Sequence, residues 1–272
     1  MQTAAQKGYK GVGMEGWTAR WYARTRLNEI DDFLQEAKKV AEKLGQEGDL
    51  LEVAPGPGYF SIELAKLGNF RIAGMDISRT FIEIASQNAR RASVNIIAFR
   101  LGNASAMPFP DESFDFVYCS AAFKNFPQPI AAMNEMYRAL RPGGQALIRD
   151  LRKDVSLDEI RSYIRQSGRS WFDAWLTKMA FQHMLIKRAY TTDDFERMAS
   201  QSKFRTCQIQ TAPSASKSIS PNRRLPDAHQ KCGTAGQSAP RKGSGTPNTT
   251  TTRVDHTWRL ATFALRAQPR YA

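Results

Sequence analysis

The sequence predicts an α/β protein built on a doubly wound, mostly parallel sheet. Strand-like and helix-like segments alternate between residues 49 and 150 with short connections, as parallel strands joined by helical crossovers require. A Gly/Pro turn, APGPG at residues 54–58, separates the first of these strands from the helix that follows it. The acid Asp76 stands at the end of the next strand. Together these features indicate a ligand site at the carboxyl ends of the strands.

The periodicity of apolar residues places the elements in order. Residues 14–44 carry apolar side chains every three or four positions, which predicts one long helix that ends at Gly45. The strands are expected at residues 49–53, 71–75, 95–100, 114–119, 145–150 and 204–210. The helices between them are expected at residues 59–67, 79–92 and 130–140.

Beyond residue 150 the alternation stops. Two helical patterns at residues 156–167 and 170–187 predict a helical insertion over residues 155–190, which either forms a lid over a substrate or packs as core. Thr191 or Thr192 is expected to cap a short helix. The main domain is then expected to cover residues 14–210.

The last part of the chain differs in composition. Residues 211–257 are rich in Ser, Thr, Pro and Gly and lack a hydrophobic period, which predicts disorder. Residues 258–265 (WRLATFAL) form a candidate last strand. Either this strand pairs in a seven-stranded sheet after a long connection, or the sheet is incomplete and leaves an unpaired edge.

The net charge of +13 is concentrated in this tail. Residues 213–272 contain ten Lys and Arg but only two Asp, so they carry +8 of the total. No aromatic residue lies between Phe204 and Trp258, where a single-strand binder would need a stacking surface. A solvated basic tail is therefore favoured over a phosphate-binding arm, and no nucleic-acid partner is expected.

Several other classes of protein are disfavoured. No apolar run reaches the ~18 residues of a membrane span, and the N-terminus has no hydrophobic signal region. The three cysteines show no CxxC spacing, so neither a disulfide framework nor a metal site is expected, and Cys119 reads as a buried thiol. A cytoplasmic protein is the expectation.

The glycine turn at residues 54–58 has the composition of a ligand-binding turn. Gly56 and Gly58 lack side chains, so the backbone can approach a ligand and adopt positive φ angles. Asp76 follows Gly58 by 18 residues, and a carboxylate at that place can accept both hydroxyls of a ribose. The alternative is a purely structural turn in which Asp76 caps the next helix.

At this point the chain resembles the class I S-adenosylmethionine-dependent methyltransferases, specifically their small-molecule branch with the ubiquinone/menaquinone-biosynthesis enzymes. The resemblance covers residues 14–210 and rests on LLEVAPGPGYFSIELA, RIAGMDISRTFIEIASQNA, the PFPDESFD run and RPGG. It implies a Rossmann-like sheet of seven strands, S-adenosyl-L-methionine as cofactor and a small-molecule methyl acceptor with an O, N or C nucleophile.

The resemblance also implies roles for individual residues. The residues expected to bind the cofactor are Glu52, Ala54, Gly56 and Gly58 at its methionine part, Asp76 at the ribose, Ile77, Asn103 and Ala104 at the adenine, and Ser120 at the end of the fourth strand. Ala54 stands where the family usually has Gly, a small change that we expect to be tolerated. Asn103 stands where Asp is common, so weaker cofactor binding is expected.

The acceptor side is less specific in the sequence. The loop at residues 121–126 is expected to face the acceptor, with Lys124 and Asn125 as surface or positioning residues rather than catalytic ones. His183 is expected to pack rather than to catalyse. Trp17, Trp21 and Tyr22 either cover the cofactor as an N-terminal lid or pack on the domain.

Two other functions stay open at this level. One is a degenerate methyltransferase fold that only binds or regulates, suggested by Ala54 and Asn103. The other is a nicotinamide-dependent oxidoreductase, which the proline-interrupted turn and the PFPD segment disfavour.

Overall fold

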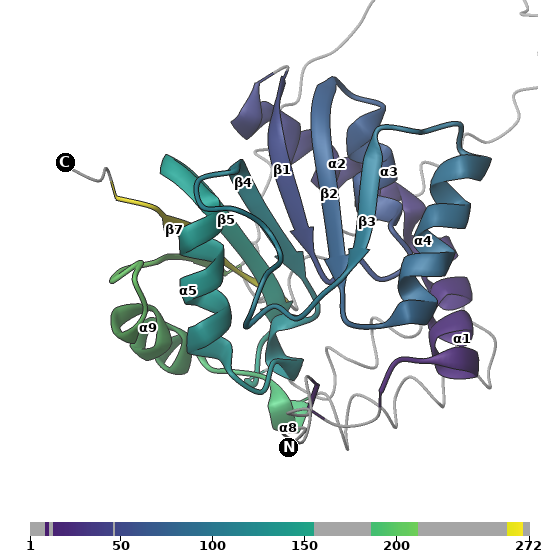
Figure 1. The fold of residues 1–272 in the computed structure, drawn as a ribbon. Coiled ribbons are helices and arrows are strands. Elements are labelled where there is room, and N and C mark those ends of the chain that lie inside the picture. The colour runs from purple at the N-terminus through teal and green to yellow at the C-terminus, as the bar shows by residue number, and fades with distance from the viewer. Residues whose placement is uncertain (1–8, 11–12, 46, 155–185, 212–259, 269–272) are drawn as a thin grey trace, which may run out of the picture. The chain divides into compact units, whose positions relative to one another are not determined.

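The computed structural model describes residues 9–10, 13–45, 47–154, 186–211 and 260–268, and every structural statement below concerns these residues. They belong to one compact unit, formed by Met1–Ala212 with His256–Ala272 (Figure 1). A second unit, Pro213–Asp255, lies outside the described residues, and so does most of the predicted helical insertion.

The core of the fold is a single sheet of seven strands in the order β3-β2-β1-β4-β5-β7-β6. The strands are β1 Glu47–Val53, β2 Asn69–Asp76, β3 Ile97–Leu101, β4 Phe114–Ser120, β5 Leu140–Leu151, β6 Gln208–Thr211 and β7 Leu260–Arg266. The first five pair in parallel, whereas β7 runs antiparallel to both β5 and β6. This confirms the predicted mostly parallel sheet.

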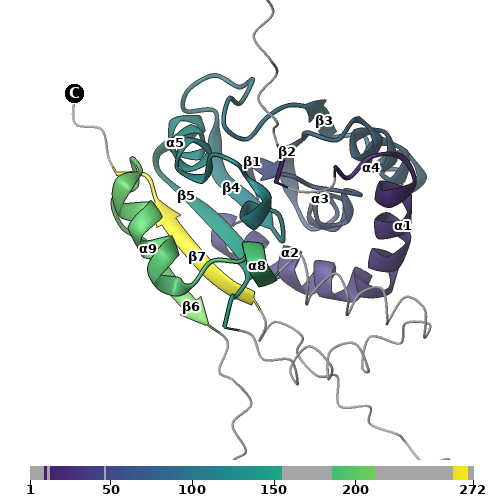
Figure 2. The ribbon, with the colours of Figure 1, turned by 90° about the horizontal axis from the view of Figure 1, so that it is seen from below.

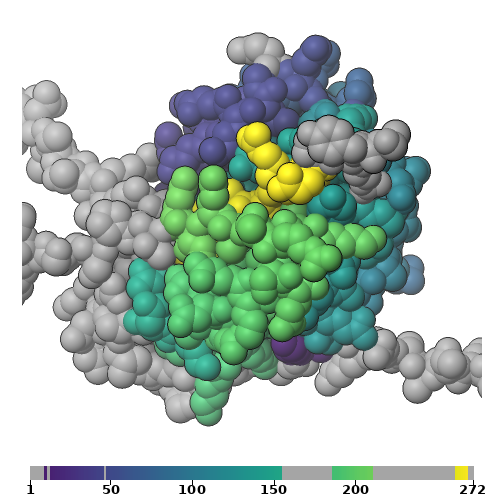
Figure 3. All heavy atoms as spheres, turned by 90° about the vertical axis from the view of Figure 1, so that its left-hand side faces the viewer, coloured from purple at the N-terminus to yellow at the C-terminus, as the bar shows by residue number. Residues whose placement is uncertain are grey.

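The late strand β7 completes the sheet. Phe263 pairs with Ile148 of β5 on one side and with Ile209 of β6 on the other. Its ring stacks on Phe195 at a centroid distance of 3.5 Å, which buries this side of the strand. The alternative of an incomplete sheet is therefore wrong. In Figure 3 the yellow residues of β7 lie beside the green residues of the segment that contains helix α9 (Thr192–Gln201) and β6.

Helices cover both faces of the sheet. They are α1 Gly16–Arg26, α2 Ile30–Leu44, α3 Tyr59–Ala65, α4 Arg79–Arg91, α5 Pro129–Ala139, α8 Ile186–Arg188 and α9 Thr192–Gln201. Figure 2 shows α5 and α9 on one side of the sheet and α2, α3 and α4 on the other. Thr191 caps α9 in a reciprocal arrangement with Asp194, which confirms one of the two predicted caps.

Several boundaries differ from those that the sequence predicts. The long helix expected at residues 14–44 is divided into α1 and α2 by a 3₁₀ turn, Leu27–Glu29, so the apolar stripe changes direction there. The strand expected at residues 145–150 begins at Leu140, because the RPGG segment continues the chain into β5. The strand expected at residues 204–210 is the shorter β6.

Each face of the sheet has its own hydrophobic core. Along β4, Val117 and Cys119 belong to the core under α5 and α9, while Phe116 and Tyr118 belong to the core under α2 and α3. Cys119 is fully buried, as predicted, and burial raises the pKa of its thiol. No helix in the described ranges is long and apolar enough to cross a bilayer.

Candidate functional site

The nine predicted cofactor residues lie at or just beyond the carboxyl ends of four adjacent strands. Because β1 lies between β2 and β4, and β2 beside β3, these strand ends share one edge of the sheet, at the lower end in Figure 1. The register fixes the alignment: Val53 pairs with Met75, and Asp76 with Leu101. The structure thus brings together residues that are up to 68 positions apart in the chain.

The turn after β1 depends on its glycines. Gly56 has a φ of +55° and Gly58 a φ of +78°, both in the region that disfavours side chains. A Cβ on Gly58 would also lie 2.9 Å from the Cβ of Ala85, so the turn passes close to α4. Conformation and packing therefore both require glycine at position 58.

Ala54 begins this turn in an unusual conformation. Its φ of +59° is the left-handed region, which costs a non-glycine residue of order 1–3 kcal/mol. Its N–H donates to the carbonyl of Met75 at 2.7 Å, which holds it there. Ala121 repeats the arrangement after β4, with φ +57° and an N–H donated to Arg149 at 2.8 Å. The effect of Ala in place of the family's usual Gly at position 54 is therefore strain in the backbone, and the sequence does not reveal this strain.

Asp76 links the second strand to the glycine turn. Its carboxylate accepts the N–H of Gly56 at 3.1 Å and that of Ser78 at 2.9 Å, and only 5% of the residue is exposed. Burial raises the pKa of this carboxyl to about 6, although the N–H donors oppose the shift. Ser78, whose hydroxyl accepts the N–H of Phe81, is the N-cap of α4. Asp76 therefore does not cap that helix.

Glu52 is a second buried acid below the turn. The hydroxyl of Ser61 on α3 donates to its carboxylate. Burial raises the pKa of Glu52 to about 7, and the charge of Asp76 adds to the shift. Glu52 thus ties α3 to β1 beneath the turn.

Apolar side chains lie exposed next to these buried acids. Ile77, the residue after Asp76, is 40% exposed. Leu101, which pairs with Asp76 in the register of β2 and β3, is 48% exposed. Ala104 is buried, and Ser120 at the end of β4 is half-buried. An exposed apolar surface beside a carboxylate matches a planar heterocycle attached to a sugar.

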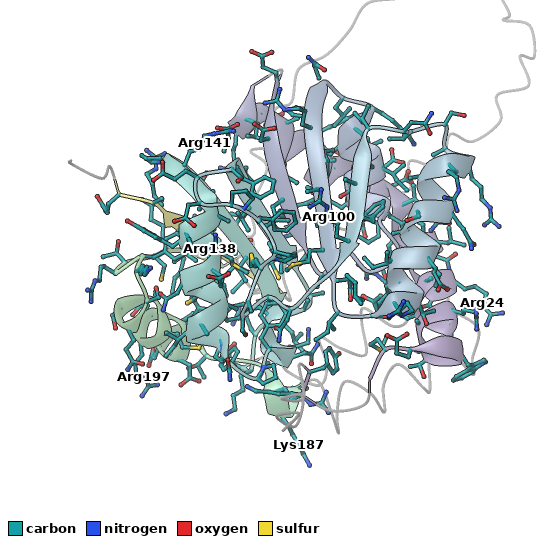
Figure 4. The ribbon with its side chains drawn as sticks, viewed as in Figure 1. Arg24, Arg100, Arg138, Arg141, Lys187 and Arg197 are labelled. Carbon is teal, nitrogen blue, oxygen red and sulfur yellow. The ribbon has the colours of Figure 1, made fainter. Side chains whose placement is uncertain are left out.

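The loop after β3 is held by α5. The guanidinium of Arg138, labelled in Figure 4, donates to the carbonyls of Phe109 at 2.8 Å and Met107 at 3.1 Å. Glu135 accepts the N–H of Met107 at 2.7 Å. Within the loop, the side-chain oxygen of Asn103 accepts the N–H of Ser105 at 3.0 Å, so part of its hydrogen-bonding capacity serves the turn itself.

The N-terminal segment is fastened to α4 beside Asp76. The carboxylate of Glu15 accepts the N–H groups of Arg79 at 2.9 Å and Thr80 at 3.1 Å, and Ser78 donates to the carbonyl of Met14 at 2.6 Å. Sequence reasoning missed Glu15, because a single exposed acid gives no periodic signal. Its carboxylate caps a helix that is more than sixty residues away in the chain.

This attachment brings α1 over the glycine turn. A methyl group built on Gly56 would lie 3.9 Å from the Tyr22 ring, and Tyr59 donates its hydroxyl to the carbonyl of Ala23 at 3.1 Å. Of the two alternatives for the aromatic residues, Tyr22 covers the turn, whereas Trp17 is 65% exposed.

Lys124 and Asn125, expected to be surface or positioning residues, are both buried, so they are not surface residues. The Lys124 ammonium lies 2.8 Å from the Asp150 carboxylate, which also accepts the N–H groups of Lys124 and Leu151, each at 2.7 Å. A buried ammonium is stable here because the end of β5 supplies its counter-charge. Sequence reasoning missed this pair, since its members are 26 positions apart.

A second group of polar residues lies next to Asn125. The N–H of Lys10 donates to the Asn125 carbonyl at 2.8 Å, and the Lys10 ammonium donates to the Tyr190 hydroxyl at 3.1 Å. Burial raises the pKa of the neighbouring Tyr9 to about 12. His183 lies outside the described residues. Within the described part of the chain, no group of three His, Cys, Asp or Glu residues is placed to hold a metal ion.

Part of the chain is similar in sequence to known methyltransferases. The model of a family described as a methyltransferase domain matches residues 51–148. Demethylmenaquinone methyltransferase of Listeria welshimeri is 32% identical over 127 residues, which are 44% of this chain and 54% of that protein. The Deinococcus radiodurans enzyme of the same name is 37% identical over 100 residues, 36% of this chain and 41% of that protein. The chain spans about half the length of these curated relatives.

Solved structures share the fold. The superposition on a SAM-dependent methyltransferase of Thermotoga maritima covers 92% of this chain and 96% of that protein's chain, with a TM-score of 0.53 and 20% sequence identity. The superposition on a candidate S-adenosyl-L-methionine-dependent methyltransferase of Methanococcus maripaludis covers 74% of this chain and 90% of that protein's chain, with a TM-score of 0.58 and 20% sequence identity. Over residues 51–148 the chain is thus similar to a methyltransferase domain family, and it shares its fold with these two solved methyltransferases, as the resemblance predicts.

Proposed function

We propose that this protein transfers a methyl group from S-adenosyl-L-methionine to a small-molecule acceptor. The observation that carries the proposal is the contact between Gly56 and Asp76, which joins the glycine turn to a buried acid at one sheet edge. The exposed apolar side chain of Ile77 adjoins that acid. Turn, acid and apolar surface fit the three parts of the cofactor in the order methionine, ribose and adenine.

The residues present suit this cofactor. The backbone of residues 54–58 is open to close approach, and the Asp76 carboxylate, with two lone pairs on each oxygen, can accept ribose hydroxyls beyond its present two N–H bonds. Ile77 and Leu101 offer apolar area to the adenine, and the half-buried Ser120 lies where β4 meets the site. Asn103 and Ala104 complete the adenine side in this proposal.

When bound, the cofactor supplies a methyl group that its sulfonium already activates. The protein then has to align the acceptor and exclude water, and alignment alone contributes several orders of magnitude in rate. Tyr22 and α1 cover the glycine turn. The segment Phe123–Asn125 delimits the acceptor side and is fixed to β5 through Asp150.

We take the first class of acceptor to test from the names of the relatives. Because the similar curated proteins are named demethylmenaquinone methyltransferases, reduced quinones are the first acceptors to test. The cytoplasmic location expected from the sequence stays a prediction, and so does the absence of a nucleic-acid partner.

The experiment is a calorimetric titration with S-adenosylhomocysteine, followed by a screen for products with labelled S-adenosylmethionine. We expect binding in the wild type and a loss of about tenfold or more in affinity for Asp76→Ala, because charge-assisted hydrogen bonds to the ribose disappear. The matched control is Asp32→Ala, which removes an exposed acid of α2. Absence of binding in the wild type would favour the non-catalytic alternative.

A further inference from the structure

A cluster of polar residues lies on the acceptor side, apart from the residues assigned to the cofactor. It consists of Lys10, Asn125 and Tyr190, with Phe123 beside them. We propose that this polar cluster binds an anionic oxygen of the methyl acceptor, from either a carboxylate or an ionised phenol. The inference rests on the proposed function and adds the charge of the acceptor to it.

The cluster is assembled from three distant parts of the chain. The Lys10 N–H donates to the Asn125 carbonyl at 2.8 Å, which fixes the N-terminal segment on the turn after β4. The Lys10 ammonium donates to the Tyr190 hydroxyl at 3.1 Å and lies 5.5 Å from the centre of that ring. The Tyr190 ring is 6.0 Å from that of Phe123, which is fully buried.

The cluster offers hydrogen-bond donors for an anion. Lys10 uses one of its three ammonium protons on Tyr190, and because the Tyr190 oxygen accepts that bond, its own proton is directed elsewhere. Among the described residues, no carboxylate lies within ion-pair distance of Lys10, whereas the nearby Lys124 is neutralised by Asp150. In this proposal the Lys10 ammonium supplies the positive charge that an acceptor anion balances.

Asn125 provides the second, independent observation. Only 5% of this residue is exposed, yet its side-chain oxygen is the one buried side-chain polar atom in the described ranges without a hydrogen-bond partner. An unpaired buried oxygen costs about 1–3 kcal/mol, so a bound N–H or O–H donor would relieve it. In this proposal Lys10 and Tyr190 supply the donors, and Asn125, whose backbone carbonyl binds the Lys10 N–H, supplies the unpaired acceptor, for a ligand that presents an anionic oxygen next to a hydrogen-bond donor.

Paired probes that differ in charge test this assignment. The full chain is saturated with S-adenosylhomocysteine and titrated with 2-naphthoate against neutral 2-naphthamide, and with 4-nitrophenolate against neutral 4-nitroanisole. The variants are Lys10→Met, Lys10→Arg and, as matched control, Lys187→Met. Lys187 is exposed and extends from α8 away from the sheet (Figure 4).

We expect at least one anion to bind about tenfold more tightly than its neutral partner, as a charge-assisted hydrogen bond predicts. The preference should fall below about threefold in Lys10→Met and persist in Lys10→Arg and Lys187→Met. A preference for naphthoate alone indicates a carboxylate, and one for nitrophenolate alone indicates an ionised phenol. Equal binding of anion and neutral probe, no binding of either anion at millimolar concentration, or an unchanged preference in Lys10→Met overturns the proposal.

The affinity for S-adenosylhomocysteine separates this proposal from the proposed function. All three variants should bind it like the wild type, because Lys10 and Lys187 are not among the residues assigned to the cofactor. Normal binding with no anion preference removes only the present inference. Loss of binding in the wild type would refute the proposed function itself.

Discussion

The ammonium group of Lys124 lies 2.8 Å from the carboxylate of Asp150, and both residues are almost completely buried. The same carboxylate holds the backbone N–H groups of Lys124 and Leu151. This one acid therefore fixes the turn Phe123–Asn125, which carries the acceptor-side residues, to the end of β5.

Removing Asp150 should destabilise the protein more than removing Lys124. Asp150→Ala leaves a buried ammonium without a counter-charge, so we expect the free energy of unfolding to fall by about 3–5 kcal/mol. Lys124→Met should cost less, because Asp150 keeps two N–H donors. Urea denaturation of both variants, with Asp154→Ala as an exposed control, measures the difference. A larger loss in Lys124→Met would contradict this account.

Ala54→Gly should stabilise the fold. Its φ of +59° suits glycine, and relief of that strain outweighs the greater freedom of glycine in the unfolded chain, for a net gain of about 0.5–1 kcal/mol. Ala73→Gly, in the ordinary conformation of β2, is the matched control and should lose roughly that amount. Denaturant midpoints measured in parallel test the sign. A loss of stability in both variants would show that Ala54 is unstrained.

Affinity for S-adenosylhomocysteine should depend on pH through Asp76. In the proposed site the ribose hydroxyls donate to the ionised carboxylate of Asp76, whose pKa burial raises to about 6. Affinity should therefore be constant well above pH 6 and weaken by up to about tenfold per pH unit below it. Asp76→Asn should bind more weakly and lose this dependence, whereas Asp32→Asn, at an exposed acid of α2, should retain it. A wild-type profile that is flat between pH 5 and pH 7, the range that spans this pKa, argues against Asp76 as the ribose ligand.

Glu15 should control how long the cofactor stays bound. Its carboxylate fastens the N-terminal segment to Arg79 and Thr80, next to the acid at the ribose position. In Glu15→Ala we expect the dissociation rate of S-adenosylhomocysteine, followed by stopped-flow fluorescence, to rise about threefold to tenfold, since charge-assisted bonds are lost.

Glu42→Ala is the control for this effect, because Glu42 is an exposed acid on α2. Equal dissociation rates in Glu15→Ala and the wild type would mean that the N-terminal segment does not restrain the ligand.

Much of the fold follows from local patterns in the sequence. The alternation of strands and helices, the glycine turn and Asp76 depend on neighbours in the chain, and the structure has them in the predicted order. The predicted strand at residues 258–265 also exists, shifted to Leu260–Arg266. What the sequence left open was its pairing, because that is decided by β5 and β6 and not by the strand itself.

The missed features all depend on contacts between distant residues. Lys124 reads as a surface residue until Asp150 is placed beside it, and Glu15 reads as solvated until α4 begins next to it. The φ angle of Ala54 is set by the neighbouring strand through Met75. Periodicity and composition carry none of this information.

The position of β7 has a consequence for synthesis on the ribosome. Since β6 is paired in the sheet with β7 alone, it cannot adopt its final place until residues 260–266 have emerged from the exit tunnel, whereas β5 is already paired with β4. Until then a nascent chain exposes the hydrogen-bonding groups of β5, where another polypeptide can attach. Translation that halts before residue 260 should therefore yield an aggregation-prone product, with β6 left without a neighbour.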